Sequence, residues 1–150
     1  MVNKPIAVAV AILYTEEHFL LQLRDDVPGI AYPGHWGLFG GHIEAGETPI
    51  VALQRELCEE IGYTTYQIIK FRTYEDSGVI RHVFSAHLTV TLDQLVLSEG
   101  WDMDLVTLDS IRQGSCYSHK ADSVRPIAKP HQQILLDFRL DTGKTGTKFY

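Results

Sequence analysis

One helix is marked more firmly than any other element, and it is bounded by Thr48 and Gly62. Thr48 is a good N-cap, and the proline after it suits the first helical position, where no backbone N–H is needed. Gly62 is a natural stop. The apolar stripe between these ends recurs at helical spacing and consists of Ile50, Leu53, Leu57 and Ile61. The sequence therefore predicts an amphipathic helix over residues 49–61 whose apolar face is buried.

Strand patterns lie on both sides of this helix. The predicted strands cover residues 6–14, 18–24, 36–39, 67–74, 79–90 and, more weakly, 94–97 and 104–108. The first two form a hairpin, and the third runs into a glycine pair. A second helix is predicted over residues 130–140. Strands before and after one central helix, with another helix at the end, predict an α/β sandwich.

The chain length favours one domain, which we place at residues 1–140. Residues 141–150 have almost no apolar content before Phe149 and are predicted to form a flexible tail. The apolar run at residues 6–14 is too short to span a bilayer, and a second apolar run follows it. A buried strand therefore fits this run better than a signal peptide.

The net charge of -6 argues against general binding to nucleic acids or membrane surfaces, which usually requires a basic patch. It leaves room for an anionic small molecule if a cation mediates the contact. Cys58 and Cys116 are the two cysteines, and no Cys-x-x-Cys pair exists. We expect both to be reduced thiols and the protein to be cytoplasmic.

Three carboxylates share one face of the predicted helix, because Glu56, Glu59 and Glu60 are related by i,i+3 and i,i+4 spacing. Arg55 is the basic residue close by. One interpretation is a solvated charged face, although such faces usually intersperse lysine. The other is a cation site, since a glycine pair at positions 40 and 41 would let the backbone approach closely. Mg²⁺ or Mn²⁺ prefers such hard oxygen ligands and is completed by substrate phosphates.

A longer pattern surrounds these carboxylates. It comprises Gly41, five residues, Glu47, seven residues and then the run RELCEEIGY, residues 55–63. This pattern resembles the Nudix box, with every required Gly, Glu and Arg in register. The one departure is Tyr63, where an aliphatic residue is usual, and it should affect packing rather than chemistry.

The resemblance implies a Nudix-type α/β/α sandwich, with a mixed β-sheet between helices. It also implies a hydrolase that cleaves a nucleoside diphosphate linked to another group X, by water attack on phosphorus with Mg²⁺ or Mn²⁺. The compact chain favours a nucleoside triphosphate or small nucleotide derivative as substrate. The alternative is a non-catalytic nucleotide-sensing module, but such domains usually lose a glutamate of the box. Nudix domains are often dimers, so a homodimer is an expectation of the family alone.

The resemblance also implies roles for individual residues. The implied metal ligands are Glu56, Glu59, Glu60 and the carbonyl of Gly40. Glu47 would pair with Arg55, which orients the catalytic carboxylates. The group that accepts a proton from water stays open between Glu56, Glu59 and a carboxylate outside the box.

Candidates outside the box are less firmly marked. Glu99 is the first candidate for a further metal ligand and Glu75 the second, although either could be an ordinary loop or surface residue. The candidates for substrate contacts are Arg24 for a phosphate, His42, and Tyr32, Trp36 and Trp101 for stacking on a base. For each of these the alternative is ordinary packing or a surface position.

Overall fold

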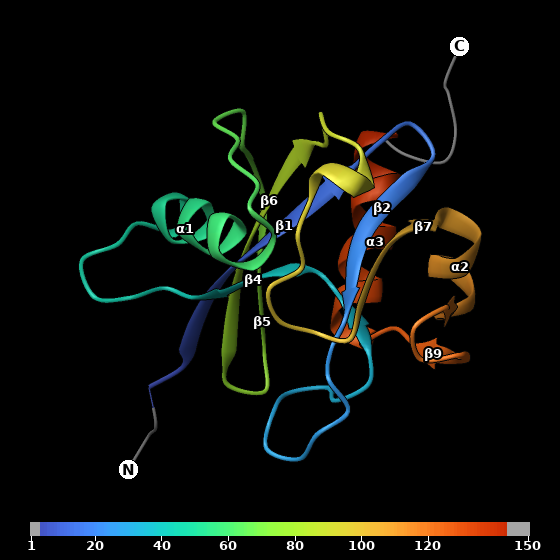
Figure 1. The fold of residues 1–150 in the computed structure, drawn as a ribbon. Helices are drawn as coiled ribbons and strands as arrows, with labels where there is room; N and C mark the ends of the chain where they lie inside the picture. The colour runs from blue at the N-terminus through green and yellow to red at the C-terminus, as the bar shows by residue number, and fades with distance from the viewer. Residues whose placement is uncertain (1–3, 144–150) are drawn as a thin grey trace.

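A mixed β-sheet lies between helices in the computed structural model of the chain, which describes residues 4–143 (Figure 1). The strands are β1 (Ile6–Tyr14), β2 (His18–Leu23), β3 (Trp36–Gly37), β4 (Phe39–His42), β5 (Ile69–Asp76), β6 (Val79–His87), β7 (Asp102–Thr107), β8 (Ser115–Ser118) and β9 (Ser123–Pro126). The helices are α1 (Pro49–Ile61), the 3₁₀ turn η1 (Leu92–Gln94), α2 (Leu108–Gln113) and α3 (Lys129–Thr142). This arrangement confirms the predicted α/β/α sandwich.

Strand β1 is the centre of the sheet, and the strand order is β3-β2-β1-β6-β5. It pairs in parallel with β6 along its whole length. On its other edge it changes neighbour, because β4 pairs antiparallel with residues 8–11 and β2 pairs with Tyr14. Strand β7 extends the sheet beyond β2. The two strands β4 and β2 therefore pair with different stretches of the same edge of β1.

The two faces of β1 pack against different helices because successive side chains point to opposite sides of a strand. Ala9, Ala11 and Leu13 belong to the core cluster that contains the buried residues of α1. Val10 and Ile12 belong to the cluster that contains the buried residues of α3. Figure 1 shows α1 on one side of the sheet and α3 on the other. The apolar run that β1 carries is thus a strand buried on both faces.

Helix α1 has the predicted bounds and caps. The Thr48 Oγ1 accepts a hydrogen bond from the Val51 N–H at 3.3 Å, and Gly62 has the left-handed φ of 65° that favours glycine. One stripe residue was predicted wrongly, because Ile50 is 36% exposed while Ala52 is buried. Helical spacing gives the direction of a side chain around the axis. It does not tell how far the sheet extends beneath the first turn.

The predicted strand over residues 94–97 is wrong. A 3₁₀ turn ends at Gln94, and the segment after it bonds to the end of α1 instead of to a strand. The Val96 N–H donates to the Ile61 carbonyl at 3.2 Å, and the Ser98 N–H donates to the Glu60 carbonyl at 2.9 Å. Carbonyls at a helix C-terminus lack partners within the helix, so they accept hydrogen bonds from the N–H groups of this segment. These bonds hold the segment beside the carboxylates of α1.

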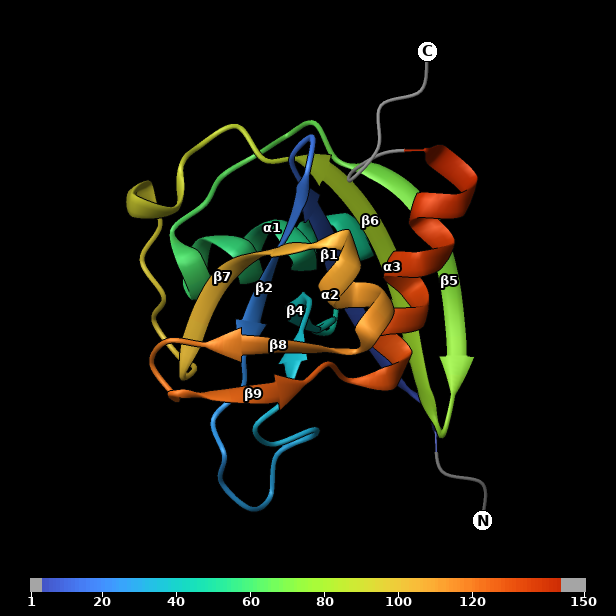
Figure 2. The same cartoon turned by 90° about the vertical axis from the view of Figure 1, so that its right-hand side faces the viewer.

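Other boundaries moved by a few residues. The predicted strands 18–24, 67–74 and 79–90 are found as β2, β5 and β6, and 104–108 is found as β7 with α2 following directly. The short hairpin of β8 and β9, which lies beside α2 and α3, was not predicted (Figure 2). The second predicted helix is α3, which continues through Thr142. The rest of the predicted tail, residues 144–150, lies outside the described residues. None of the helices in residues 4–143 has the length and apolar character needed to span a bilayer.

Candidate functional site

The glycine pair lets the backbone of β4 approach both β1 and α1 closely. Gly40 has a φ of 148°, and a Cβ atom on it would overlap the carbonyl oxygen of Ala9. A Cβ atom on Gly41 would lie 2.5 Å from the carboxylate carbon of Glu56. A side chain at position 40 therefore has no room, and one at position 41 would have to displace the carboxylate of Glu56. The backbone of β4 lies against the helix face that carries the carboxylates.

Arg55 connects the loop before α1 to the helix. Its Nε and Nη2 donate to the two carboxylate oxygens of Glu47 at 2.8 and 2.9 Å, which is a bidentate ion pair. Hydrogen bonds from Arg55 lower the pKa of Glu47 to about 2, and the same contact raises the pKa of Arg55. The planar guanidinium suits this two-point contact in a way that lysine would not.

The same guanidinium reaches two carboxylates of the helix. Its Nη1 lies 2.9 Å from an oxygen of Glu56 and 3.5 Å from an oxygen of Glu59. Its Nη2 donates to the carbonyl of His42 at 3.1 Å. Arg55 thereby ties β4, the loop and α1 together and holds Glu56 in one position.

Glu60 has a different environment from its two neighbours. Burial raises its pKa to about 8, and the adjacent Glu56 adds to the shift through a hydrogen bond and its charge. The amide of Gln22 lies 3.5 Å from a Glu60 oxygen. Without a cation, burial and the charge of Glu56 therefore favour the protonated form of Glu60. A bound divalent cation would favour the ionised form of both.

One cavity of about 320 Å³ gathers the predicted metal ligands. Its lining residues are Gln22, Arg24, Gly40, Glu56, Glu59, Glu60, Ser98 and Glu99. We call it the acidic cavity. No set of three or more His, Cys, Asp or Glu side chains in residues 4–143 stands ready to hold a metal ion. The oxygen donors that line the acidic cavity are of the hard kind that fits Mg²⁺ or Mn²⁺.

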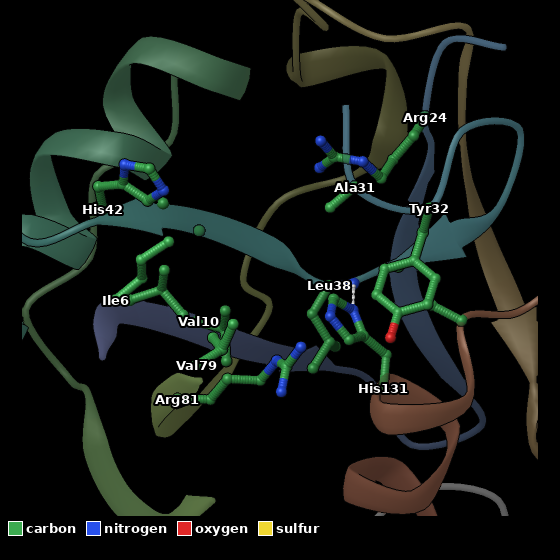
Figure 3. Close-up of a pocket in the computed structure, with 15 residues that line it drawn as sticks. Ile6, Val10, Arg24, Ala31, Tyr32, Leu38, His42, Val79, Arg81 and His131 are labelled. Carbon is green, nitrogen blue, oxygen red and sulfur yellow. Dashed lines mark hydrogen bonds between the residues drawn. The ribbon is translucent and has the colours of Figure 1, made fainter. Parts of the chain in front are cut away.

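A second cavity of about 330 Å³ adjoins the acidic cavity, and Arg24 and Gly40 line both (Figure 3). We call it the side cavity. Tyr32 and His42, predicted as substrate contacts, line it too. The Nε of Arg24 is buried and has no hydrogen-bond partner among the described residues. A donor left in this state is expected to gain a partner when a ligand binds.

Three predicted candidates lie away from both cavities. Trp36 is 0% exposed and donates from its indole N–H to the carbonyl of Cys116 at 3.0 Å. Its burial leaves no ring face for a base, so we leave it out of the proposed substrate residues. Trp101 is covered by the guanidinium of Arg125 at 4.6 Å and does not line either cavity. Glu75 lies on β5 and lines neither cavity, so Glu99 is the better candidate for a further ligand.

The lining residues that sequence reasoning missed include Gln22, Arg81 and His131. Arg81 gave a signal, since an arginine stands within an apolar strand pattern and is 6% exposed. Gln22 similarly interrupts the apolar run of β2. His131 gave none, because its position depends on how α3 packs against the link between β3 and β4.

The family model of the NUDIX domain matches residues 3–120. The chain therefore belongs to the NUDIX family, as the box predicts. Nudix hydrolase 3 of Arabidopsis thaliana is 47% identical over 49 residues, covering 32% of this chain and 6% of that protein. Nucleoside triphosphatase NudI of Escherichia coli O17:K52:H18 is 34% identical over 82 residues, covering 48% of this chain and 56% of that protein. The matches thus span less than two thirds of either curated relative.

Solved structures share the fold at low sequence identity. The MutT protein from Methanosarcina mazei Go1 has a TM-score of 0.71 at 24% identity, with 96% of this chain and 100% of that chain covered. The NUDIX domain of Shewanella oneidensis NrtR, complexed with ADP ribose, has a TM-score of 0.69 at 19% identity, with 93% and 89% covered. These similarities establish the α/β/α architecture.

Proposed function

We propose that this chain is a metal-dependent pyrophosphohydrolase that acts on a nucleoside diphosphate linked to another group. The observation that carries the proposal is the acidic cavity, whose lining includes Gly40, Glu99 and the three carboxylates of α1, Glu56, Glu59 and Glu60. The side cavity adjoins it at Arg24, which gives room for the rest of a nucleotide. Family membership supports the same activity.

Each residue of the acidic cavity has a role in this proposal. Glu56, Glu59, Glu60 and the carbonyl of Gly40 would hold the cation, with Glu99 as a further ligand. Mg²⁺ or Mn²⁺ supplies a more acidic bound water and neutralises charge on phosphate oxygens. Arg55, fixed by Glu47, keeps Glu56 in place. Glu56, Glu59 or a carboxylate outside the box accepts the proton of the attacking water, and the choice among them is left to experiment.

A nucleoside triphosphate or a small nucleotide derivative is the proposed substrate. The relative NudI is named a nucleoside triphosphatase, and the NUDIX domain of NrtR holds ADP ribose, so both compounds belong in the test. A cytoplasmic location and a homodimer complete the proposal. The two free thiols, Cys58 and Cys116, support the cytoplasmic location. The homodimer rests on the frequent dimerisation of Nudix domains.

The test is turnover of nucleoside triphosphates, nucleotide sugars, ADP-ribose and diadenosine polyphosphates with Mg²⁺ and separately with Mn²⁺. Products would be separated by chromatography. The wild type should cleave at least one class, and Glu59→Gln should not. Glu75→Gln is the matched control, because it makes the same change on an exposed strand outside both cavities.

Two results would redirect the proposal. Equal turnover by Glu59→Gln and the wild type would remove the assignment of the acidic cavity. A folded protein that binds nucleotide and metal but cleaves nothing would favour the nucleotide-sensing module.

A further inference from the structure

His131 is held in one orientation at the wall of the side cavity. Its Nδ1 accepts a hydrogen bond from the backbone N–H of Leu38 at 2.8 Å (Figure 3). A Cβ atom on Gly37 would lie 2.8 Å from the same nitrogen, so the glycine makes room for the imidazole. The first turn of α3 and the link between β3 and β4 thus fix the ring between them.

This contact settles which nitrogen of His131 carries the proton. A backbone N–H can only donate, so Nδ1 is unprotonated and the proton of the neutral ring is on Nε2. Burial, together with the charges of Arg81 and Arg24, lowers the pKa of His131 to about 3. The ring is therefore neutral over the whole physiological range. Within residues 4–143, Nε2 makes no hydrogen bond, so its N–H is a free donor at the cavity wall.

The two arginines of the side cavity are donors alone, whereas Tyr32 and His42, which also line it, can donate or accept. Arg81 is 6% exposed, and its Nη1 is held by Asp76 at 2.8 Å, which keeps a nearly buried guanidinium at the cavity. Arg24 brings a buried Nε without a partner. Arg81 lies on β6 and Arg24 just after β2, so the two arginines reach the cavity from different segments (Figure 3). Among the described lining residues there is no carboxylate and no side-chain amide.

Apolar side chains complete the wall, namely Ile6, Val8, Val10, Ala31, Leu38, Val79 and Ala128. Such apolar walls suit a flat ring, which can bury both of its faces against them. The phosphates are better served in the acidic cavity, where the proposed cation lies. The side cavity therefore suits a ring that carries hydrogen-bond acceptors.

We propose that the side cavity binds the base of the nucleotide and that His131 selects a base with a carbonyl oxygen over one with an amino group at the same position. The carbonyl oxygen accepts the N–H from Nε2, whereas an amino group would place one donor against another. This inference rests on the proposed function and names the substrate class within it: hypoxanthine, guanine, uracil or thymine nucleotides before adenine or cytosine nucleotides.

Two matched pairs of substrates test the preference. ITP and ATP differ where a purine carries its 6-oxo or 6-amino group, and UTP and CTP differ at the 4-position of the pyrimidine. The oxo member of each pair should have a kcat/KM at least about tenfold higher, which is the modest end of the cost of an unpaired buried donor. Equal kcat/KM values within both pairs, or a preference for the amino members, would overturn the inference.

Variants of His131 assign the preference to this side chain. His131→Asn keeps an oxygen to accept the Leu38 N–H and an N–H₂ to face the cavity, so it should retain most of the preference. His131→Leu removes both and should bring the ratio within each pair close to one, mainly through KM. If His131→Leu does not fold, His131→Phe asks the same question with a ring of similar shape. An unchanged ratio in the folded apolar variant would refute the role of His131.

A binding measurement separates this inference from the proposed function. Calorimetry without metal compares IMP with AMP and UMP with CMP, and it needs no turnover. Tighter binding of the oxo members in a protein that cleaves nothing would sustain the inference while the hydrolase proposal fails. Cleavage of all triphosphates without preference would sustain the hydrolase proposal and refute this inference. Failure of the folded protein to bind any monophosphate would also refute this inference.

Discussion

Replacing Gly41 with alanine should damage the site without damaging the fold. The new Cβ atom would lie 2.5 Å from the carboxylate carbon of Glu56, whereas ordinary contacts begin at 3.4 Å. Glu56 must therefore retreat by about 0.9 Å, the difference between these distances. A shift of this size ends the 2.9 Å contact with Arg55 and misplaces one proposed metal ligand.

The expected loss is about 10²-fold in kcat, the cost typical of a reacting group misplaced by about 1 Å. The backbone of Gly41 has no positive φ, so alanine is accepted there and stability should stay level or rise by about 0.5–1 kcal/mol. Steady-state kinetics on a substrate found in the turnover test would measure the loss of kcat, and thermal unfolding would measure the change in stability.

A double mutant shows whether the effect passes through Glu56. In a Glu56→Ala background the overlap is gone, so adding Gly41→Ala should change neither kcat nor melting temperature much further. A Gly41→Ala protein with wild-type kcat would refute the argument, and so would an equal loss of activity in both backgrounds.

The remaining predictions concern charge, metal and core. In the metal-free protein the free energy of unfolding should fall as pH rises from 4.5 to about 8, because folded Glu60 holds a proton that the unfolded chain releases. Thermal melts with a chelator would show this slope, and Glu60→Gln should flatten it. Mg²⁺ should raise the melting temperature of the wild type and raise that of Glu59→Gln much less; a titration with equal shifts would contradict the ligand assignment. Leu57→Ala should cost about 2–5 kcal/mol in denaturant unfolding, since Leu57 is 1% exposed, while residual kcat per folded molecule stays near wild type.

The elements that sequence predicted well depend on local chemistry. Thr48, the proline after it and Gly62 bound α1 through contacts within a few residues, so its bounds could be read directly. The grouping of Glu56, Glu59 and Glu60 follows from helix geometry alone. The family pattern requires Gly41, and the reason is visible only in the fold, where β4 lies against the helix and Gly41 faces the carboxylate of Glu56.

What sequence did not predict depends on distant packing. Residues 94–97 have the composition of a strand, but the carbonyls of Ile61 and Glu60 satisfy this segment instead. His131 is one of seven histidines, and nothing in its neighbours tells that its ring will meet Leu38, 93 residues away. The sequence offers Trp36 for stacking on a base, because nothing in a short strand after a loop indicates that its first side chain is fully buried.

The change of partner along β1 has a consequence for how this protein could diverge. The acidic cavity is lined by residues of β2, β4, α1, the loop after β2 and the segment after η1. The side cavity draws on β1, β3, β4, β6, the loop after β2 and the start of α3. Of their described lining residues, Arg24 and Gly40 are the two in common. Mutations in β1, β6 or the first turn of α3 can therefore reshape the side cavity while the lining of the acidic cavity is inherited unchanged.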